Sequence, residues 1–340
     1  MSKTIKKMFY SKLTFEKLLE AHNRASKGKK KKKEVILFEM DLETNIVKIL
    51  NDIKNGTYKF GEYREFKVYE PKERIIKSLP YRDRIVHQWY IEEFIKPYFF
   101  PKFIKDTFAC LDGRGTHLAV IKVRDYMRKM KRKYSNYYVL KCDIKKYFYS
   151  IDKNILKKIL SNSISDRRIL EFNDVVLDDG SKVGIPIGNF TSQFFANIYL
   201  NDFDHYVKEQ LKVKYYVRYM DDFILLLKTK EEAKDLKNII ETYLKTNLNI
   251  ELNKKSSYFP SNKGIDFCGY KIFETHILLR KRFKIKFKKN ILLWNKLNDE
   301  KRLDIKRMEM SLNSFLAHVS HSNSYNYIKS IEQKYKQFME

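Results

Sequence analysis

The stretch that decides the fold is YYVRYMDDFILLL, residues 215–227. Two apolar, strand-forming runs flank Met220-Asp221, with Asp222 directly behind, which predicts two strands joined by a tight turn. Such turns favour glycine and this one has none, so we expect a strained backbone at the tip. Adjacent aspartates between apolar strands also repel each other. Both costs make sense if a divalent cation sits at the tip, whereas Asp221-Asp222 taken alone also fits an ordinary acidic surface turn.

A third carboxylate strengthens the case for a metal site. Residues 137–144, YYVLKCDI, predict a buried strand whose apolar pattern is broken by Asp143. If the two strands are neighbours, Asp143, Asp221 and Asp222 converge. Hard oxygen ligands of this kind bind Mg²⁺, and two such ions can activate a 3′-hydroxyl and stabilise a leaving pyrophosphate. We expect Asp143 and Asp221 to be the ligands and Asp222 to support the site.

Helices and strands are expected on both sides of these motifs. In order, the sequence predicts helices at 13–25 and 41–55, an irregular hairpin at 63–80, helices at 82–100 and 116–133, the strand at 137–144, a helix capped by Asp152, a loop carrying Gly184, Pro186 and Gly188, a helix opened by Thr191 or Ser192, the two strands around Asp221-Asp222, a helix at 231–247, a strand near 249–252, a strand pair at 265–279 and a helical, basic tail. Residues 280–289 fit either a strand or the first helix of that tail. The pattern predicts an α+β fold with helices on one face of an antiparallel sheet.

Composition narrows the class of partner. The 340 residues are enough for two or three subdomains, and 70 Lys and Arg against 42 Asp and Glu give a net charge of +28. That surplus favours nucleic acid, with a ribosome-associated or membrane-surface protein as the alternative. No apolar run approaches the ~18 residues of a membrane span, and the N-terminus has no signal-peptide core, so we expect a soluble intracellular protein. Three scattered cysteines without a CxxC pair support neither a zinc site nor a disulfide frame.

The motifs taken together resemble a known family. Tyr219-Met220-Asp221-Asp222 with Asp143-Ile144 upstream resembles the palm signature of reverse transcriptases. Further matching blocks are Arg74–Pro80 with Arg82-Asp83-Arg84, Gly113–His117, Gly184–Gln193, Leu252–Ser256 and Gly264–Tyr270, and it is their order that is specific. The resemblance implies a right-hand polymerase with fingers, an antiparallel-sheet palm and a helical thumb. It places an N-terminal segment and fingers at 1–136, the palm at 137–279 with a fingers-associated segment near 160–190, and the thumb at 280–340.

The resemblance also implies cofactors and partners. Two Mg²⁺ ions would be held by Asp143, Asp221 and Asp222, with Ile144 counted among the metal-contacting residues. The partners would be template RNA, the RNA–cDNA hybrid and deoxynucleoside triphosphates, with no membrane. The location would be the cytoplasm of a bacterium, with a bacterial or phage gene.

One subfamily is favoured by a departure from the common pattern. Group II intron and retron enzymes usually carry Gln-Gly and Ser-Pro in the template-contacting block and alanine in the catalytic tetrapeptide. Here the residues are Ile187-Gly188, Ser192-Gln193 and Met220, which resembles the reverse transcriptases of diversity-generating retroelements. That family copies a template-repeat RNA with errors at adenines and works with a small, basic, pentameric accessory protein.

Residue roles follow from the same resemblance. Phe148 would be a steric gate for deoxynucleotides, with core packing as its alternative role. Arg74, assisted by Lys72, would clamp the triphosphate. Lys255, or its rival Lys254, would protonate pyrophosphate. The template and nucleotide block contributes Ile187, Gly188 and Gln193, and we expect Ile187 to lower fidelity because it cannot form glutamine's hydrogen bond. The histidines at 87, 117, 318 and 321 are interpreted as ordinary packing residues.

Three rival interpretations stay open at this point. One is a retron or group II-type reverse transcriptase, against which the block at 184–193 argues. Another is a catalytically inactive, basic RNA-binding scaffold, against which the three aspartates argue. The third is untemplated nucleotide addition in phage defence.

Overall fold

The chain folds into two compact units that alternate along the sequence. The computed structural model describes residues 6–69 and 73–336. Unit 1 consists of the described residues through Lys105, then Ile144–Lys212 and Ile239–Lys254. Unit 2 consists of Asp106–Asp143, Val213–Asn238 and the described residues from Lys255 onward. The predicted subdomain bounds remain a prediction.

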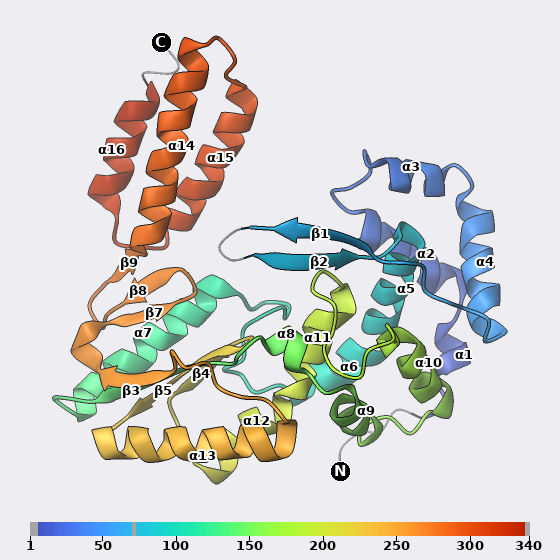
Figure 1. The fold of residues 1–340 in the computed structure, drawn as a ribbon, viewed down its shortest axis with the longest axis horizontal. Coiled ribbons are helices and arrows are strands. Elements are labelled where there is room, and N and C mark those ends of the chain that lie inside the picture. The colour runs from blue at the N-terminus through green and yellow to red at the C-terminus, as the bar shows by residue number, and fades with distance from the viewer. Residues whose placement is uncertain (1–5, 70–72, 337–340) are drawn as a thin grey trace. The chain divides into compact units, whose positions relative to one another are not determined.

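Unit 1 is mainly helical (Figure 1). Its helical segments are α1 (Phe9–Lys12), α2 (Phe15–Ser26), α3 (Lys33–Glu39), α4 (Leu42–Lys54), α5 (Tyr81–Tyr90), the π-helical η1 (Ile91–Ile95), α6 (Lys96–Phe99), the 3-10 turn η2 (Phe100–Lys102), α8 (Tyr147–Ser150), α9 (Lys153–Ser161), α10 (Arg167–Leu177), α11 (Phe190–Tyr199), α12 (Asn201–His205) and the π-helical η3 (Tyr206–Gln210). A hairpin pairs β1 (Arg64–Val68) antiparallel with β2 (Arg74–Ser78). Helix α13 (Lys230–Leu248) contributes residues to both units.

Side-chain caps fix where several of these helices begin. Thr14 accepts a hydrogen bond from the Lys17 amide at the start of α2, and Asp152 does the same for α9. Asp166 caps α10 and also accepts from the Met8 amide at 2.6 Å. The N-terminal segment is thereby attached to a helix more than 150 residues away in sequence.

A loop of unit 1 packs against the β1–β2 hairpin. The Lys77 amide of β2 donates to the Ile187 carbonyl at 2.9 Å. Gly188 has a φ of +117°, and a Cβ at this position would lie 2.8 Å from Ile76 Cγ2 and 2.9 Å from the Lys77 carbonyl oxygen. Only glycine tolerates both the backbone conformation and the close approach. The loop that carries Ile187 and Gly188 is therefore held to the strand that begins at Arg74.

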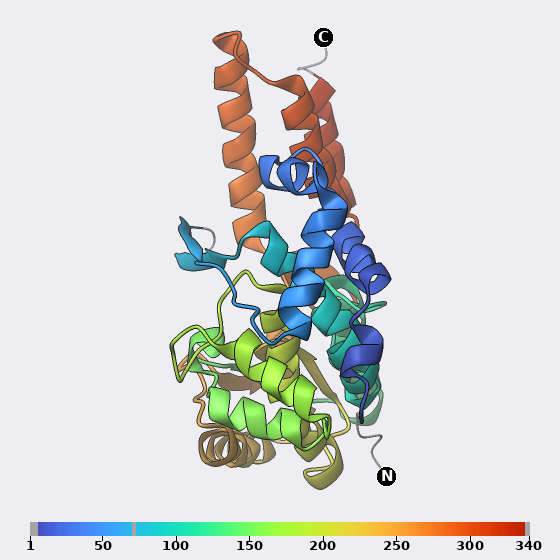
Figure 2. The same ribbon diagram turned by 90° about the vertical axis from the view of Figure 1, so that its right-hand side faces the viewer.

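Unit 2 is built on two antiparallel sheets. The larger has the order β4-β5-β3-β6, with β3 (Tyr138–Asp143), β4 (Tyr216–Tyr219), β5 (Asp222–Leu227) and β6 (Ser257–Pro260). The 3-10 turn η4 (Ser261–Lys263) leads to the smaller sheet of β7 (Ile265–Phe267), β8 (Tyr270–Ile272) and β9 (Ile277–Leu279). Helix α7 (Thr116–Lys133) and the C-terminal helices α14 (Lys281–Asp299), α15 (Ile305–Val319) and α16 (Tyr325–Lys336) complete the unit (Figures 1 and 2).

The core of unit 2 joins α7 to both sheets. Val123 and Met127 of α7 pack with Val139 of β3 and Ile224 of β5, and the apolar side chains of β7–β9 belong to the same cluster. The C-terminal helices have a second cluster, in which Phe287 stacks on Phe315 with 3.7 Å between ring centroids. No helix in the described part of the chain is both long and apolar enough to cross a bilayer.

Most predicted elements are confirmed, and the others differ in their bounds or in their type. The helix expected at 82–100 changes to π-helical geometry at Ile91, and the helix expected from Thr191 or Ser192 begins at Phe190, with Asn189 as N-cap, and breaks at Leu200. The strand expected near 249–252 is reduced to one bridge between Ile144 and Leu252. The strand pair at 265–279 is three strands. Residues 280–289 were predicted to be either a strand or the start of a helix, and the helix α14 begins at Lys281.

We predict that Gly188→Ala destabilises the protein by about 2 kcal/mol or more, because it combines a positive-φ cost with a clash against β2. Thermal unfolding of the purified variant measures this. Gly180→Ala is the matched control, because Gly180 has a φ of +77° and a Cβ added there would meet no atom within 4 Å. Equal losses in the two variants would contradict the contact with β2.

Candidate active site

The pairing of β3 with β5 brings the predicted carboxylates together. In the antiparallel register, Asp143 lies directly opposite Asp222, and Tyr219 of β4 lies opposite Asp222 on the other side. Met220 and Asp221 are the two residues of the turn between β4 and β5. Residues 143, 221 and 222 therefore meet at one end of the sheet, all within unit 2.

The turn at the hairpin tip is strained, as predicted from its lack of glycine. Met220 has a φ of +58°, which matches the first central position of a type II′ turn and is costly for a residue with a side chain. Nη1 of Arg218, a fully buried side chain, donates to the Met220 carbonyl at 3.0 Å. The backbone of Arg218 is itself bonded to Asp106 and Phe108. These contacts of Arg218 were not predictable from the sequence, because an arginine inside a strand usually faces solvent.

Asp222 is in an environment that opposes its charge. Burial is the largest cause, and the nearby carboxylates of Asp143 and Asp221 add to it, so that the pKa of Asp222 rises to about 7 although Lys141 pulls it down. Lys141 Nζ lies 3.5 Å from Asp222 Oδ2, and the other oxygen, Oδ1, is buried without a hydrogen-bond partner among the described residues. A buried oxygen of this kind is costly unless another group binds it.

Lys141 and Cys268 both interact with Asp222, although the sequence analysis assigned a role to neither. Lys141 also donates from Nζ to the Asp266 carbonyl of β7, which links the two sheets at the carboxylate end. Cys268 and Gly269 form the turn between β7 and β8, both with positive φ. The pKa of the Cys268 thiol is raised, first by burial and then by the negative charge of Asp222.

Ser256 fixes the segment that carries Lys255. The Asp143 amide donates to Ser256 Oγ at 3.1 Å, and that hydroxyl lies 3.3 Å from the Asp143 carbonyl. Lys255 itself is exposed. Lys254 is exposed as well, so which of the two lysines has the predicted role stays a prediction.

The donor set fits a divalent cation of the hard type. Carboxylate oxygens of Asp143 and Asp221 and the unpartnered Oδ1 of Asp222 lie at one end of the sheet, and a cation would offset the repulsion that raises the pKa of Asp222. Across residues 6–69 and 73–336, no group of three or more His, Cys, Asp or Glu side chains is arranged to hold a metal ion by itself. Mg²⁺ usually binds through one or two carboxylates and keeps waters and substrate phosphates as its other ligands, so Asp143 and Asp221 would hold it only together with such ligands.

The remaining predicted residues lie in unit 1. Ile144 is buried, so only its backbone carbonyl has ligand character. Arg74 is exposed on β2, Phe148 is half-buried in α8, and Gln193 is exposed in the first turns of α11. The Phe148 carbonyl accepts from the Ile185 amide at 2.8 Å, which ties α8 to the loop of Ile187 and Gly188. Lys72 falls outside the described residues.

We predict that Asp222→Asn raises the melting temperature in metal-free buffer and that the gain grows from pH 5 to pH 8. The pKa of Asp222 is raised from 3.8 to about 7 in the folded protein. Between these two values the folded protein binds more protons at this carboxyl than the unfolded chain does. The free energy of unfolding of the wild type therefore falls as the pH rises through this range. Asparagine cannot ionise. The expected gain at pH 8 is on the order of a few degrees.

Thermal unfolding in EDTA at both pH values measures this effect. Asp235→Asn, on the exposed side of α13, is the control for loss of a carboxylate. A gain for Asp222→Asn that is identical at pH 5 and pH 8 would contradict the assigned cause.

Comparison with known proteins agrees with this geometry. A family model for reverse transcriptase (RNA-dependent DNA polymerase) matches residues 67–272, more than half of the chain. A putative COX1/OXI3 intron 2 protein of Saccharomyces cerevisiae is 23% identical over 304 residues, which cover 66% of this chain and 34% of that protein. Protein YkfC of Escherichia coli is 27% identical over 187 residues, covering 43% of this chain and 48% of that protein. The chain thus spans between a third and a half of the length of these relatives.

Solved structures of telomerases are also similar to this chain. Apo telomerase from Candida tropicalis, truncated from its C-terminal domain, has a TM-score of 0.48 at 16% identity and covers 68% of this chain and 59% of its own. Telomerase from Candida albicans, solved with a fragment of telomeric RNA, has a TM-score of 0.47 at 12% identity. The match covers 71% of this chain and 51% of the telomerase chain. At these scores the likeness adds no weight to the assignment.

The family match confirms the predicted fold class. The antiparallel sheets and helices are those of an α+β, right-hand polymerase fold with fingers, palm and helical thumb. The match covers all three aspartates, the turn of Met220 and the loop of Ile187. The chain belongs to the reverse transcriptase (RNA-dependent DNA polymerase) family.

Proposed function

We propose that this protein is an RNA-directed DNA polymerase that extends a DNA strand on an RNA template. The observation that carries the proposal is the placement of Asp143 opposite Asp222 at the tip of the β4–β5 hairpin, inside a region that matches the family. Because the chain spans less than half of the length of its matched relatives, its activity, template and substrates are part of the proposal.

The chemistry at the carboxylates follows from their surroundings. When bound at Asp143 and Asp221, divalent cations, two Mg²⁺ ions in our proposal, supply Lewis acidity toward the attacking 3′-hydroxyl and the leaving pyrophosphate. Asp143 and Asp221 present the oxygens, and the Ile144 carbonyl is a further candidate ligand. Lys141 partly balances the charge of Asp222, and this pairing orients Asp222.

Nucleotide binding is assigned to residues of unit 1 and to Lys255. Arg74 is exposed and its side chain makes no hydrogen bond or ion pair with other described residues, so its guanidinium is available for a triphosphate. Phe148 would exclude a 2′-hydroxyl. Gly188 and Gln193 would contact template or nucleotide. Lys255, exposed beside Ser256, would donate the proton that pyrophosphate needs on leaving.

The finer proposal concerns the biological role. Ile187 and Gln193 stand where related enzymes that copy faithfully carry other residues, so we assign the chain to mutagenic copying of a template-repeat RNA in a diversity-generating retroelement. The cDNA, with errors at adenines, would replace a variable repeat in a target gene, with help from a small, basic, pentameric accessory protein. The backbone of Ile187 is bonded to the Lys77 amide of β2, which supports a fixed position for this residue in the loop.

We predict that Asp221→Asn lowers primer extension on an RNA template at least ~100-fold, because one ligand loses its charge while the fold keeps an isosteric side chain. Incorporation of labelled deoxynucleotides measures the rate, and Asp235→Asn is expected to retain wild-type activity. Extension by Asp221→Asn at the wild-type rate would overturn the catalytic assignment. Product formed without template would instead indicate untemplated addition.

We predict that Ile187→Gln lowers the frequency of misincorporation opposite adenine, because a glutamine amide restores a hydrogen bond beside the nascent pair. Ile187→Met is the matched control, since methionine has similar length but no amide. Sequencing of cDNA made on one RNA by the three proteins measures the error spectrum. Equal error at adenines in all three proteins would exclude Ile187 as its cause.

A further inference from the structure

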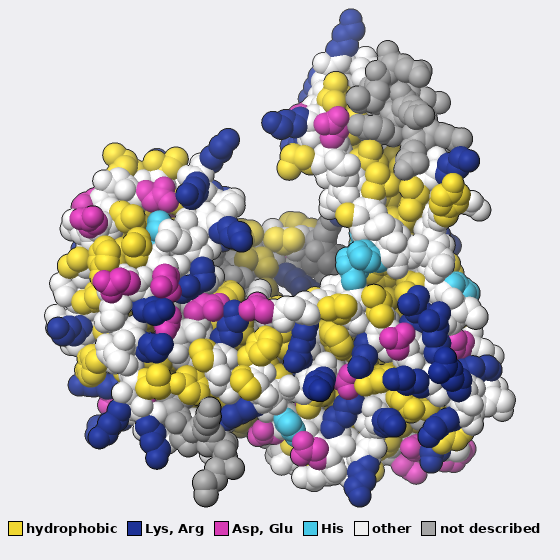
Figure 3. Space-filling model, turned by 180° about the vertical axis from the view of Figure 1, so that it is seen from behind, with side chains coloured by type: hydrophobic (Ala, Val, Ile, Leu, Met, Phe, Trp, Pro, Cys, Tyr) yellow, Lys and Arg dark blue, Asp and Glu magenta, His cyan; other side chains and the backbone are white. Residues whose placement is uncertain are grey.

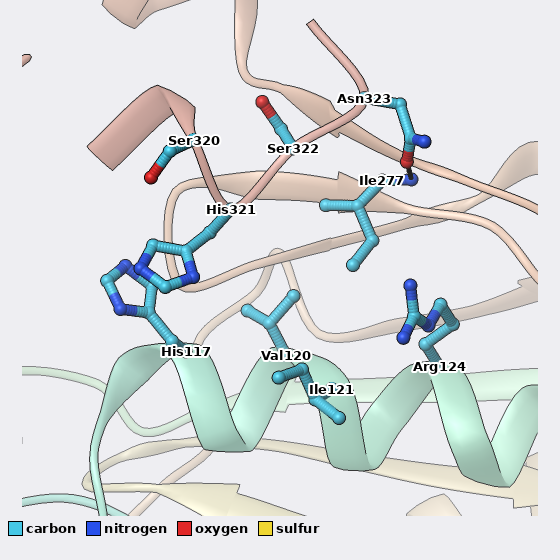
Figure 4. A pocket seen from close by; sticks show the side chains of 9 residues that line it. All are labelled: His117, Val120, Ile121, Arg124, Ile277, Ser320, His321, Ser322 and Asn323. Carbon is cyan, nitrogen blue, oxygen red and sulfur yellow. Dashed lines mark hydrogen bonds between the residues drawn. The ribbon is translucent and has the colours of Figure 1, made fainter. Parts of the chain in front are cut away.

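A pocket in unit 2 lies between the first half of α7 and the segment that joins α15 to α16. Its volume is about 250 Å³, and Val120 and Ile121 contribute its apolar floor (Figure 4). The joining segment, Ser320–Asn323, is fixed to β9, because the Asn323 amide donates to the Ile277 carbonyl at 2.8 Å and Asn323 Oδ1 accepts from the Ile277 amide at 2.9 Å. The pocket therefore has walls held by three separate elements.

Two histidines stack at one end of this pocket. The rings of His117, in the first turn of α7, and His321 have centroids 3.4 Å apart and an interplanar angle of 21° (Figure 4). Burial and the neighbouring His321 lower the pKa of His117. Neither ring makes a hydrogen bond with another described residue, so their nitrogens are available to a ligand. The packing role assigned to these two residues from the sequence is incomplete.

Arg124 lies two turns further along α7 and lines the same pocket. Its Nε is buried without a hydrogen-bond partner, and its guanidinium makes no ion pair with any residue of the described ranges. No Asp or Glu is among the described residues that line the pocket. A partly buried cation with an unused donor and no counterion is costly. A bound anion would offset this cost.

We propose that this pocket binds one phosphate of a nucleic-acid backbone. A guanidinium fork matches phosphate geometry, and the imidazole nitrogens of His117 and His321 are further polar groups that line the pocket. Lys and Arg side chains are spread over the face shown in Figure 3, and the net charge of +28 attracts a polyanion in preference to a small anion. The inference rests on the proposed function for its source of phosphate, but the pocket is separate from the carboxylate site.

Arg124→Gln tests the site against Arg132→Gln, which removes the same charge from an exposed position on the same helix. Fluorescence anisotropy with a labelled RNA–DNA hybrid in EDTA gives the dissociation constant at several salt concentrations. We expect Arg124→Gln to weaken binding about tenfold and to reduce the slope against log salt by about one. Arg132→Gln is expected to change affinity less than about threefold. Equal effects of the two variants overturn the proposal.

Replacing single phosphates of the hybrid with neutral methylphosphonates locates the contact. We expect one position at which the substitution weakens the wild type but leaves Arg124→Gln unaffected, since the contact is already lost. If every position affects both proteins alike, the pocket does not hold a backbone phosphate. Wild-type protein that neither binds nor extends the hybrid would overturn the proposed function, whereas normal extension with unchanged binding by Arg124→Gln would overturn only this inference.

A titration with inorganic phosphate tests whether the pocket binds free phosphate rather than a phosphate of the nucleic-acid backbone. NMR titration of the imidazole signals with roughly 20 mM phosphate or with the hybrid reports the pKa of His117. The backbone proposal predicts that the hybrid raises this pKa in the wild type but not in Arg124→Gln. A rise with inorganic phosphate alone, and none with the hybrid, would identify a site for free phosphate and overturn the assignment to nucleic acid.

Discussion

The antiparallel register between β3 and β5 is the constraint on which the candidate active site depends. Asp143 and Asp222 are opposite each other only in this register, and a slip of one residue would turn each strand's side chains to the other face. Val139 and Ile224 pack under α7, so the slip would also expose the core. The apolar residues of the strands therefore fix the positions of the carboxylates.

The site is costly for the folded state at several points. Met220 has a left-handed backbone, Asp222 is buried near two other carboxylates, and its Oδ1 has no hydrogen-bond partner among the described residues. Residues that oppose stability in this way are found where function requires them. Two residues reduce the free-energy cost of the site. Arg218 donates a hydrogen bond to the turn, and Lys141 places a positive charge near Asp222.

Close packing also fixes functional groups in unit 1 and in the pocket of His117, Arg124 and His321. Gly188 allows the loop of Ile187 to approach β2 more closely than any side chain would permit, and the Lys77 amide fixes its position. Arg124 and the stacked histidines are likewise held by a rigid helix and a loop bonded to β9, with their polar atoms unused. Preformed positions of this kind reduce the conformational entropy lost when a ligand binds.

The sequence by itself determined longer helices such as α2, α4, α7 and α13, the strands β3, β4 and β5, and which aspartates stand at the strand ends, because periodicity, caps and the absence of glycine at the turn are local properties. It did not predict α3 or α10. It also indicated the strain at Met220 and a polyanionic partner. The short strands were not predictable: β6 was missed, 249–252 was overpredicted, and 265–279 was divided differently, since three-residue strands depend on neighbours distant in the chain. Only the tertiary structure decided the partners of Arg218, Lys141 and Ser256, and the contact of His117 with His321. Apart from the bond of Arg218 to Met220, these contacts join residues that are far apart in the chain, so they form only after the sheet and α7 have packed.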